Sequence, residues 1–212
     1  MNGEPRLPQE IEAESFRRIE AQAGAPAFPP GVWPVVRRMI HTTGDFDYLK
    51  TVRIHPRALA AGVAALRRGC VLGTDTRMLL AGISTGRLNR LGVEAFCLMT
   101  EPEVAREAVR RGTTRAAVAM EQALPRLAGG IVAIGNAPTA LLRLLELLAA
   151  GSAPPALVVG VPVGFVNAAE SKEALTQHDC PYITALGPKG GSAVAAAIIN
   201  ALAVMALEEM PT

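Results

Sequence analysis

The sequence predicts a single α/β domain in which helices cover both faces of a doubly wound, mostly parallel sheet. Short apolar runs alternate with longer segments of helical pattern along most of the 212 residues. Half of the residues are apolar but only 4% are aromatic, so Ala, Val and Leu must fill the interior. No internal repeat or long linker interrupts the chain, and we expect one domain over residues 1–212.

The segment 131–148, IVAIGNAPTALLRLLELL, is the most informative part of the chain. Its first four residues predict a strand buried on both faces, Gly135 and Asn136 predict a sharp turn, and Pro138 suits the first turn of a helix. Such turns lie at the carboxyl ends of parallel strands, where ligands bind. The backbone amides of 135–137 are therefore candidates to bind an anionic ligand group, and a purely structural turn is the alternative.

The other elements follow from periodicity and from turn residues. We expect a frayed start at 1–8 and then a helix at 8–23, with Ile11, Ser15, Phe16 and Ile19 on one face. Strands are expected at 51–55 on an edge of the sheet, and at 70–74, 93–99, 131–134, 156–161 and 182–186. Further helices are expected after residue 75, after the glycine turn near 164, and at 35–42, 56–68, 101–110, 112–127, 138–150 and 193–207.

Charge and cysteine content exclude several classes of protein. The net charge of +2 gives no general attraction to nucleic acid. Cys70, Cys97 and Cys180 are scattered, without CxxC or metal-ligand spacing, so we expect no metal site and a reducing cytoplasm. The first residues lack the apolar core of a signal peptide, and the uncharged segment 190–207 contains Gly, Ser and Asn, which favours a buried helix over a membrane span.

The segment 38–50, RMIHTTGDFDYLK, brings an imidazole, two hydroxyls and two carboxylates together. His41 ends a helical turn, where the helix dipole and the carboxylates of Asp45 and Asp47 favour the protonated imidazole. This combination is typical of acid–base chemistry. A helix-terminal histidine followed by two aspartates as ordinary turn residues is the alternative that the residues leave open.

Four further positions are candidates for function. Asp75 follows a buried strand, and capping of the next helix is its ordinary role. Arg115 opposes the dipole at a helix N-terminus, which suggests a functional reason for its place. Lys189 precedes an amide-rich turn able to cradle an anion, although it lacks P-loop spacing. Ser15 is a hydroxyl on an apolar stripe, and a hydrogen bond to a backbone carbonyl is its ordinary role.

Four stretches, RMIHTTGDFDYLK, GNAPTALLRLLE, VGVPVGFVNAAESKEAL and ALGPKGGSAVAAAIINAL, resemble the precorrin-8X methylmutases, and the resemblance covers about residues 11 to 202. It implies a flavodoxin-like fold and a homodimer with active sites near the subunit interface. It also implies an isomerase of cobalamin biosynthesis that moves a methyl group from C11 to C12 of a tetrapyrrole corrin precursor by a 1,5-sigmatropic shift. No metal or nucleotide cofactor is implied, and no nucleic acid or membrane partner is expected.

The resemblance also implies roles for individual residues. His41 matches the catalytic histidine, which is expected to protonate the nitrogen of ring C and so ease the migration. Ser15, Arg38 and Arg115 match positions that contact the substrate, whose acetate and propionate groups suit bidentate arginine. Other residues are expected to line the pocket: Thr42, Thr43, Asp75, Asn136, Lys189 and Ser192.

The strings at 41–50 and 185–202 resemble the cobalt, oxygen-independent branch of the family, which implies cobalt-precorrin-8 as substrate and cobyrinate as product. The chain departs from that branch at Gly44, where Ala is expected, and at Pro188, where a basic residue is expected. The alternatives are a precorrin-8X methylmutase that gives hydrogenobyrinate and a carrier that holds tetrapyrrole intermediates without turnover. A flavin or nucleotide binder is disfavoured by the sparse aromatics and the absence of GxGxxG.

Overall fold

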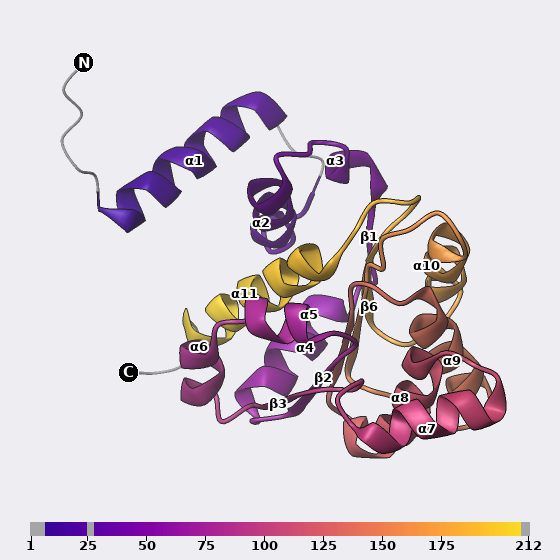
Figure 1. Cartoon of the computed structure of the whole chain (residues 1–212). Helices are drawn as coiled ribbons and strands as arrows, with labels where there is room; N and C mark the ends of the chain where they lie inside the picture. Colours follow the sequence, from indigo (N-terminus) through magenta and orange to yellow (C-terminus); the bar gives the residue numbers. More distant parts are fainter. Residues whose placement is uncertain (1–6, 25–27, 209–212) are drawn as a thin grey trace.

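The computed structural model describes residues 7–24 and 28–208, so most of the start expected to be frayed lies outside the described residues. Its strands are short and form one sheet (Figure 1). They are Val52–Ile54 (β1), Val71–Thr74 (β2), Glu94–Cys97 (β3), Ile131–Ile134 (β4), Leu157–Gly160 (β5) and Tyr182–Ala185 (β6). Across the sheet their order is β1-β6-β5-β4-β2-β3.

The helices lie before the sheet, between its strands and after it. Those in the first half of the chain are Pro8–Ala23 (α1), Trp33–Thr43 (α2), Tyr48–Thr51 (α3), Ala58–Arg67 (α4), Arg77–Gly82 (α5), Thr85–Arg90 (α6) and Pro102–Arg111 (α7). Those that follow are Arg115–Ala123 (α8), Pro138–Ala149 (α9), Ala168–Thr176 (α10) and Ser192–Glu208 (α11), with the 3-10 helix Leu124–Leu127 (η1) after α8.

The strand order identifies the edge at which ligands bind in this class of fold. All strand pairs are parallel except β1 with β6, so the predicted edge strand near 51–55 is confirmed. Numbered along the chain, the parallel strands lie in the order 2-1-3-4-5, which is the flavodoxin-like arrangement. The order reverses between β2 and β4, and the loops that follow Thr74 and Ile134 therefore lie at the switch point.

Helices cover both faces of the sheet, which confirms the predicted fold class (Figure 1). One core contains Leu66 of α4 and Leu202 of α11, and the other contains Leu141 of α9. Alternate side chains of β4 enter different cores, since Ile131 belongs to the first and Val132 to the second. The apolar run IVAI is buried on both faces for this reason, as predicted.

Two predictions about helix ends were wrong. The cap of α5 is Thr76 rather than Asp75, because the Thr76 hydroxyl accepts a hydrogen bond of 3.1 Å from the backbone N–H of Leu79. The Ala-rich helix expected to reach residue 127 ends as α8 at Ala123 and continues only as the 3-10 helix η1. Pro125 has no N–H to extend the α-helical ladder, which accounts for the change.

The first and last helices frame the region that contains the candidate site. None of the described helices is long and apolar enough to cross a membrane, and α11 is buried against α2, α4 and α5, as predicted for this segment. In contrast, α1 packs on α2 at the margin of the domain and has no fully buried residue (Figure 1). Ion pairs of Glu12 with Arg38 and of Glu20 with Arg37 hold α1 against α2.

Candidate active site

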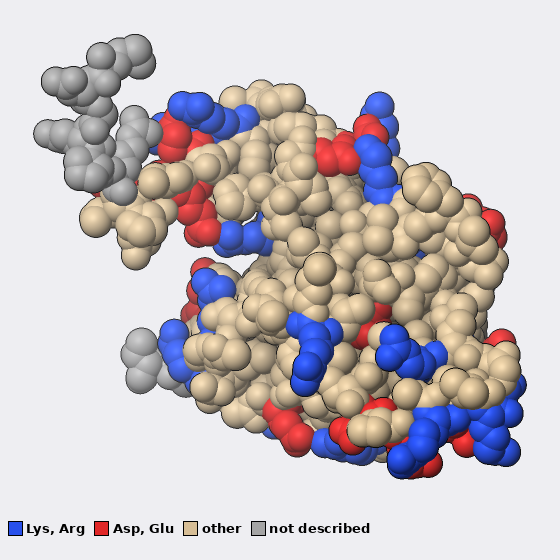
Figure 2. All heavy atoms as spheres, viewed as in Figure 1, with Lys and Arg blue, Asp and Glu red and all other residues tan. Residues whose placement is uncertain are grey.

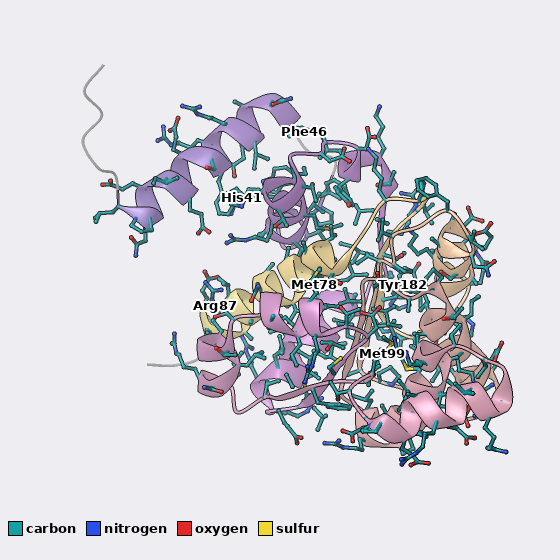
Figure 3. The ribbon with its side chains drawn as sticks, in the orientation of Figure 1. His41, Phe46, Met78, Arg87, Met99 and Tyr182 are labelled. Carbon is teal, nitrogen blue, oxygen red and sulfur yellow. The ribbon has the colours of Figure 1, made fainter. Side chains whose placement is uncertain are left out.

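A cleft of 320 Å³ between α1, α2, α6 and α11 contains the predicted catalytic histidine. Figure 2 shows a notch beside α1 with acidic and basic side chains at its rims, and Figure 3 shows His41 and Arg87 on opposite sides of this region. The residues that line the cleft are Glu12, Arg38, His41, Thr42, Gly82, Arg87, Ala193, Ala196, Ala197 and Asn200.

The placement of His41 follows from the sequence of α2. Arg38, His41 and Thr42 are spaced i, i+3 and i+4, so they share the face of α2 that borders the cleft. The helix ends at Gly44, which has a φ of +67° and donates its N–H to the carbonyl of Ile40 at 2.7 Å. Alanine would be strained in this left-handed position, so the departure at Gly44 suits the turn that follows His41.

Phe16 of α1 contacts the imidazole of His41. The two rings meet edge to face, with 5.3 Å between their centroids and an interplanar angle of 69°. The guanidinium carbons of Arg37 and Arg38 lie 4.0 Å and 4.8 Å from the centroid of the Phe16 ring. The packing of α1 on α2 therefore also fixes the surroundings of the imidazole.

Glu12 is the acidic residue that lines the cleft. Its carboxylate accepts a hydrogen bond of 2.6 Å from Nη1 of Arg38. This hydrogen bond holds the pKa of Glu12 below its usual value, and the positive charges of Arg38, His41 and Arg87 act in the same direction, although burial opposes them. The cleft thus combines an exposed imidazole with two arginines and one carboxylate.

A second group of predicted residues lies at the switch point. Asp75 is buried, and its carboxylate accepts hydrogen bonds from the N–H groups of Gly135, Asn136 and Ala137 at 3.0, 2.7 and 2.8 Å. Burial raises the pKa of Asp75, and these three donors counteract the rise. The anion bound by the turn is therefore the chain's own carboxylate, which favours the structural interpretation that the sequence left open.

Ser192 is the first residue of α11 and packs against the turn at Gly135. Its hydroxyl lies 2.9 Å from that of Thr76. A Cβ atom on Gly135 would lie only 2.7 Å from the Cα atom of Ser192, so glycine is required for this close approach. Since residues 193–200 of α11 include four that line the cleft, α11 connects the switch point with the surroundings of His41.

Lys189 is bound to two carboxylates of the chain. Its ammonium nitrogen lies 2.6 Å from Oδ2 of Asp45 and 2.6 Å from Oδ2 of Asp47, and these two hydrogen bonds raise the pKa of Lys189. The N–H of Asp45 in turn donates to the hydroxyl of Thr43 at 3.2 Å. The turn after β6 is thereby tied to the end of α2, and a ligand anion must compete with both carboxylates for Lys189.

Other predicted residues lie outside the cleft or satisfy the backbone. The Ser15 hydroxyl donates to the carbonyl of Ile11 at 2.8 Å, which is the ordinary role considered above. The Thr42 hydroxyl donates in the same way to the carbonyl of Arg38 at 2.9 Å. Arg115 is exposed at the start of α8, beside α9, and does not line the cleft. Of the predicted residues, the cleft brings together Arg38, His41 and Thr42.

Three polar residues of the cleft, Glu12, Arg87 and Asn200, were not predicted as site residues. Glu12 shares a helix face with Ser15, Phe16 and Ile19. A carboxylate on this otherwise apolar face could have identified Glu12 as a candidate site residue. Asn200 is an amide in an otherwise apolar helix, and it fastens the α5–α6 connection by accepting from the N–H of Ser84 and donating to the carbonyl of Gly82, both at 2.9 Å. Nothing in the local sequence around Arg87 indicated a role in ligand binding.

Another pocket of the described surface, of 470 Å³, lies between α5, α6 and β3. It is lined by residues such as Arg77, Leu88 and Val93, none of which was predicted to bind a ligand. Within residues 7–24 and 28–208, no three His, Cys, Asp or Glu side chains are close enough to hold a metal ion.

Comparison with known proteins assigns the family. The family model of precorrin-8X methylmutase matches residues 10–205. The chain is 43% identical to the cobalt-precorrin-8 methylmutase of Priestia megaterium (94% of this chain, 88% of that one). It is 44% identical to the precorrin-8X methylmutase of Pseudomonas aeruginosa (92% and 94%). The crystal structure of the precorrin-8X methylmutase of Thermus thermophilus superimposes with a TM-score of 0.86 at 43% identity (93% and 98%). The chain therefore belongs to the precorrin-8X methylmutase family of isomerases in cobalamin biosynthesis.

Proposed function

We propose that the protein moves a methyl group from C11 to C12 of cobalt-precorrin-8, giving cobyrinate, and that it does so in the cytoplasm. The observation that carries this proposal is the position of His41, an exposed imidazole in a cleft with two arginines, in a chain of this family. The name of the Priestia megaterium relative supports the choice of the cobalt-containing substrate. Cobalt enters the site as part of the substrate.

His41 is the proposed proton donor. It protonates the nitrogen of ring C, which withdraws electron density from the neighbouring conjugated carbons and lowers the barrier to migration. After the 1,5-sigmatropic shift the proton returns to His41, so that substrate and product contain the same atoms. The shift requires no nucleophile, and the remaining residues act by positioning the macrocycle and polarising it. The edge contact with Phe16 restricts the orientation of the imidazole.

The proposed contacts to the substrate extend beyond the cleft to the carboxyl edge of the sheet. Arg38 and Arg115 bind peripheral carboxylates, and Lys189 supplies a further positive charge. The remaining proposed contacts are Ser15, Thr42, Thr43, Asn136 and Ser192, whereas the buried Asp75 acts on the site only by holding the turn 135–137. Because Arg115 does not line the cleft of its own protomer, we propose that a homodimer completes the binding surface.

A cobalt-free substrate is the second candidate, because the Pseudomonas aeruginosa relative is named a precorrin-8X methylmutase. Titration of cobyrinate and of hydrogenobyrinate into the protein, followed by the absorbance of each pigment, separates the two candidates. We expect the cobalt-containing pigment to bind at least as tightly. Clearly tighter binding of hydrogenobyrinate would assign the protein to the other substrate.

Replacement of the proposed proton donor tests the catalytic role. His41→Ala should lower the rate of turnover by about two or more orders of magnitude, as expected for a missing general acid, while pigment binding persists. His178→Ala, near the end of α10, is the matched control and should leave turnover unchanged. A His41→Ala variant with normal turnover would contradict the mechanism. A wild type that binds pigment without converting it would identify a carrier.

A further inference from the structure

Two charged residues of the cleft have no part in the proposed proton transfer. Glu12 comes from α1 and Arg87 comes from α6, and both line the cleft that contains Arg38 and His41. They are contributed by elements on opposite sides of the opening, as Figure 3 shows for α1 and for the labelled Arg87. A sigmatropic shift requires neither a carboxylate nor a second guanidinium, so their presence needs another explanation.

The positive charge in the cleft exceeds what Glu12 neutralises. Arg38 is hydrogen bonded to the Glu12 carboxylate at 2.6 Å. The guanidinium group of the half-buried Arg87 forms no hydrogen bond or ion pair with the described residues, and it interacts with Glu12 as a more distant charge. The cleft therefore has an arginine whose donors are available to a second anion.

Glu12 itself is held weakly. Its side chain is 47% exposed, and α1 contributes no fully buried residue. An ion pair with this exposure contributes little to stability, because water and salt screen it. A planar carboxylate that reaches both arginines would gain charge-assisted hydrogen bonds from two guanidinium groups. Exchange of Glu12 for such a ligand group is therefore favourable.

We propose that Arg38 and Arg87 form a subsite for one carboxylate side group of the ligand, and that Glu12 occupies this subsite in the absence of ligand. This inference rests on the proposed function, which supplies a substrate with several acetate and propionate groups. When the ligand binds, its carboxylate replaces that of Glu12 beside Arg38 and accepts hydrogen bonds from Arg87, while Glu12 turns to solvent. Glu12 is thus an internal competitor that lowers affinity.

Pigment titration of single variants tests this competition. Glu12→Gln should bind cobyrinate about three- to fivefold more tightly than the wild type, because an exposed ion pair no longer has to be broken. Arg87→Gln should bind it about tenfold more weakly, because a charge-assisted hydrogen bond is lost. A gain of affinity on removal of a cleft residue is a result that general damage to the site does not produce.

Matched controls are available on the same helices. Glu20→Gln breaks the other ion pair between α1 and α2, that with Arg37, at a residue that does not line the cleft. If looser packing of α1 were the cause of tighter binding, Glu20→Gln would show it too. Arg90→Gln removes an exposed arginine of α6 outside the cleft and should leave affinity unchanged. Equal affinities of wild type and Glu12→Gln overturn the inference.

A simple polycarboxylate tests the subsite independently of the proposed function. Tricarballylate should shift the side-chain Nε–Hε resonances of Arg38 and Arg87 in the NMR spectrum, and at lower concentration in Glu12→Gln. If wild type binds no pigment but tricarballylate gives these shifts, the proposed function fails and the subsite stands. If tricarballylate shifts neither resonance and pigment affinity is insensitive to Glu12 and Arg87, the subsite does not exist.

Discussion

Asp75 and Glu12 illustrate, for single residues, how surroundings decide what a carboxylate does. Asp75 is buried at the switch point and is surrounded by the backbone donors of 135–137. It stabilises a turn that would otherwise leave three N–H groups unpaired. Glu12 is half exposed and paired with one flexible side chain, so its partner can be exchanged. The first carboxylate stabilises the fold, whereas the second is proposed to compete with the ligand for Arg38.

The turn should be sensitive to the charge of Asp75. Asp75→Asn keeps the shape of the side chain but places an NH₂ group against a backbone N–H, so we expect the free energy of unfolding to fall by about 1–3 kcal/mol. Urea unfolding measures this change. Asp179→Asn, which alters an exposed ion pair with Arg57, is the control and should cost less than about 1 kcal/mol. Equal losses in the two variants would remove the structural role of Asp75.

Among the elements, a chain of polar contacts joins α10 to α2 through the turn after β6. Lys172 of α10 has no exposed surface, and its ammonium group donates to the carbonyl of Lys189 at 2.8 Å. Lys189 continues the chain to Asp45 and Asp47, which follow α2. The position of the segment that follows His41 therefore depends partly on Lys172, which lies far along the chain.

The buried lysine should make stability depend on pH. Burial lowers the pKa of Lys172 to about 8 from its usual 10.5. Above pH 8 the unfolded chain keeps a proton that the folded chain releases, so stability attributable to Lys172 rises with pH. Relative to Lys172→Met, the wild type should gain about 1 kcal/mol of unfolding free energy between roughly pH 7.5 and 9.

Urea unfolding at several pH values measures this difference. Lys50→Met replaces an exposed lysine and serves as the control, with no change relative to wild type across the same interval. Parallel pH profiles for wild type and Lys172→Met would show that Lys172 keeps its usual pKa in the folded protein. The comparison with a variant cancels the titration of other groups, such as the half-buried thiol of Cys70.

For the whole molecule, large apolar side chains are exposed near the carboxyl edge of the sheet. Phe165 is 94% exposed and Val166 78%, in the loop after β5, and Met78 is 74% exposed at the start of α5. Water around side chains of this size is unfavourable, and exposed apolar groups that occur together are typical of protein interfaces. This edge is also the one at which the proposed substrate binds.

We expect the protein to be a homodimer that covers this edge. Sedimentation equilibrium at micromolar concentration should therefore give about twice the monomer mass of 22.2 kDa. Phe165→Asp should shift the equilibrium toward the monomer, because association would bury a charge. Val109→Asp alters a valine of α7 that is 85% exposed, and it should not change the mass. A monomer mass for the wild type would contradict this prediction.

The elements themselves could be predicted because their signals are local. The run IVAI, the turn at 135–136 and Pro138 predicted β4 and α9 from side-chain period and backbone preference alone. His41 could be named as a candidate from its motif, since the residues of that motif lie within one segment. Thr76 was missed as a cap because Asp75 is the commoner capping residue by type, and burial drew Asp75 to another partner.

Contacts between distant segments could not be predicted in this way. Asp75 meets the N–H of Gly135 across 60 residues, Glu12 meets Arg38 across 26, and Lys189 meets Asp45 across 144. Side-chain period specifies which face of a helix or strand is apolar, but the same faces can pack in several orders. The local pattern thus established an α/β chain with a candidate histidine. The packing of its layers decided the strand order, the hydrogen bonds of Asp75 to the turn 135–137 and the position of Arg87 opposite α1.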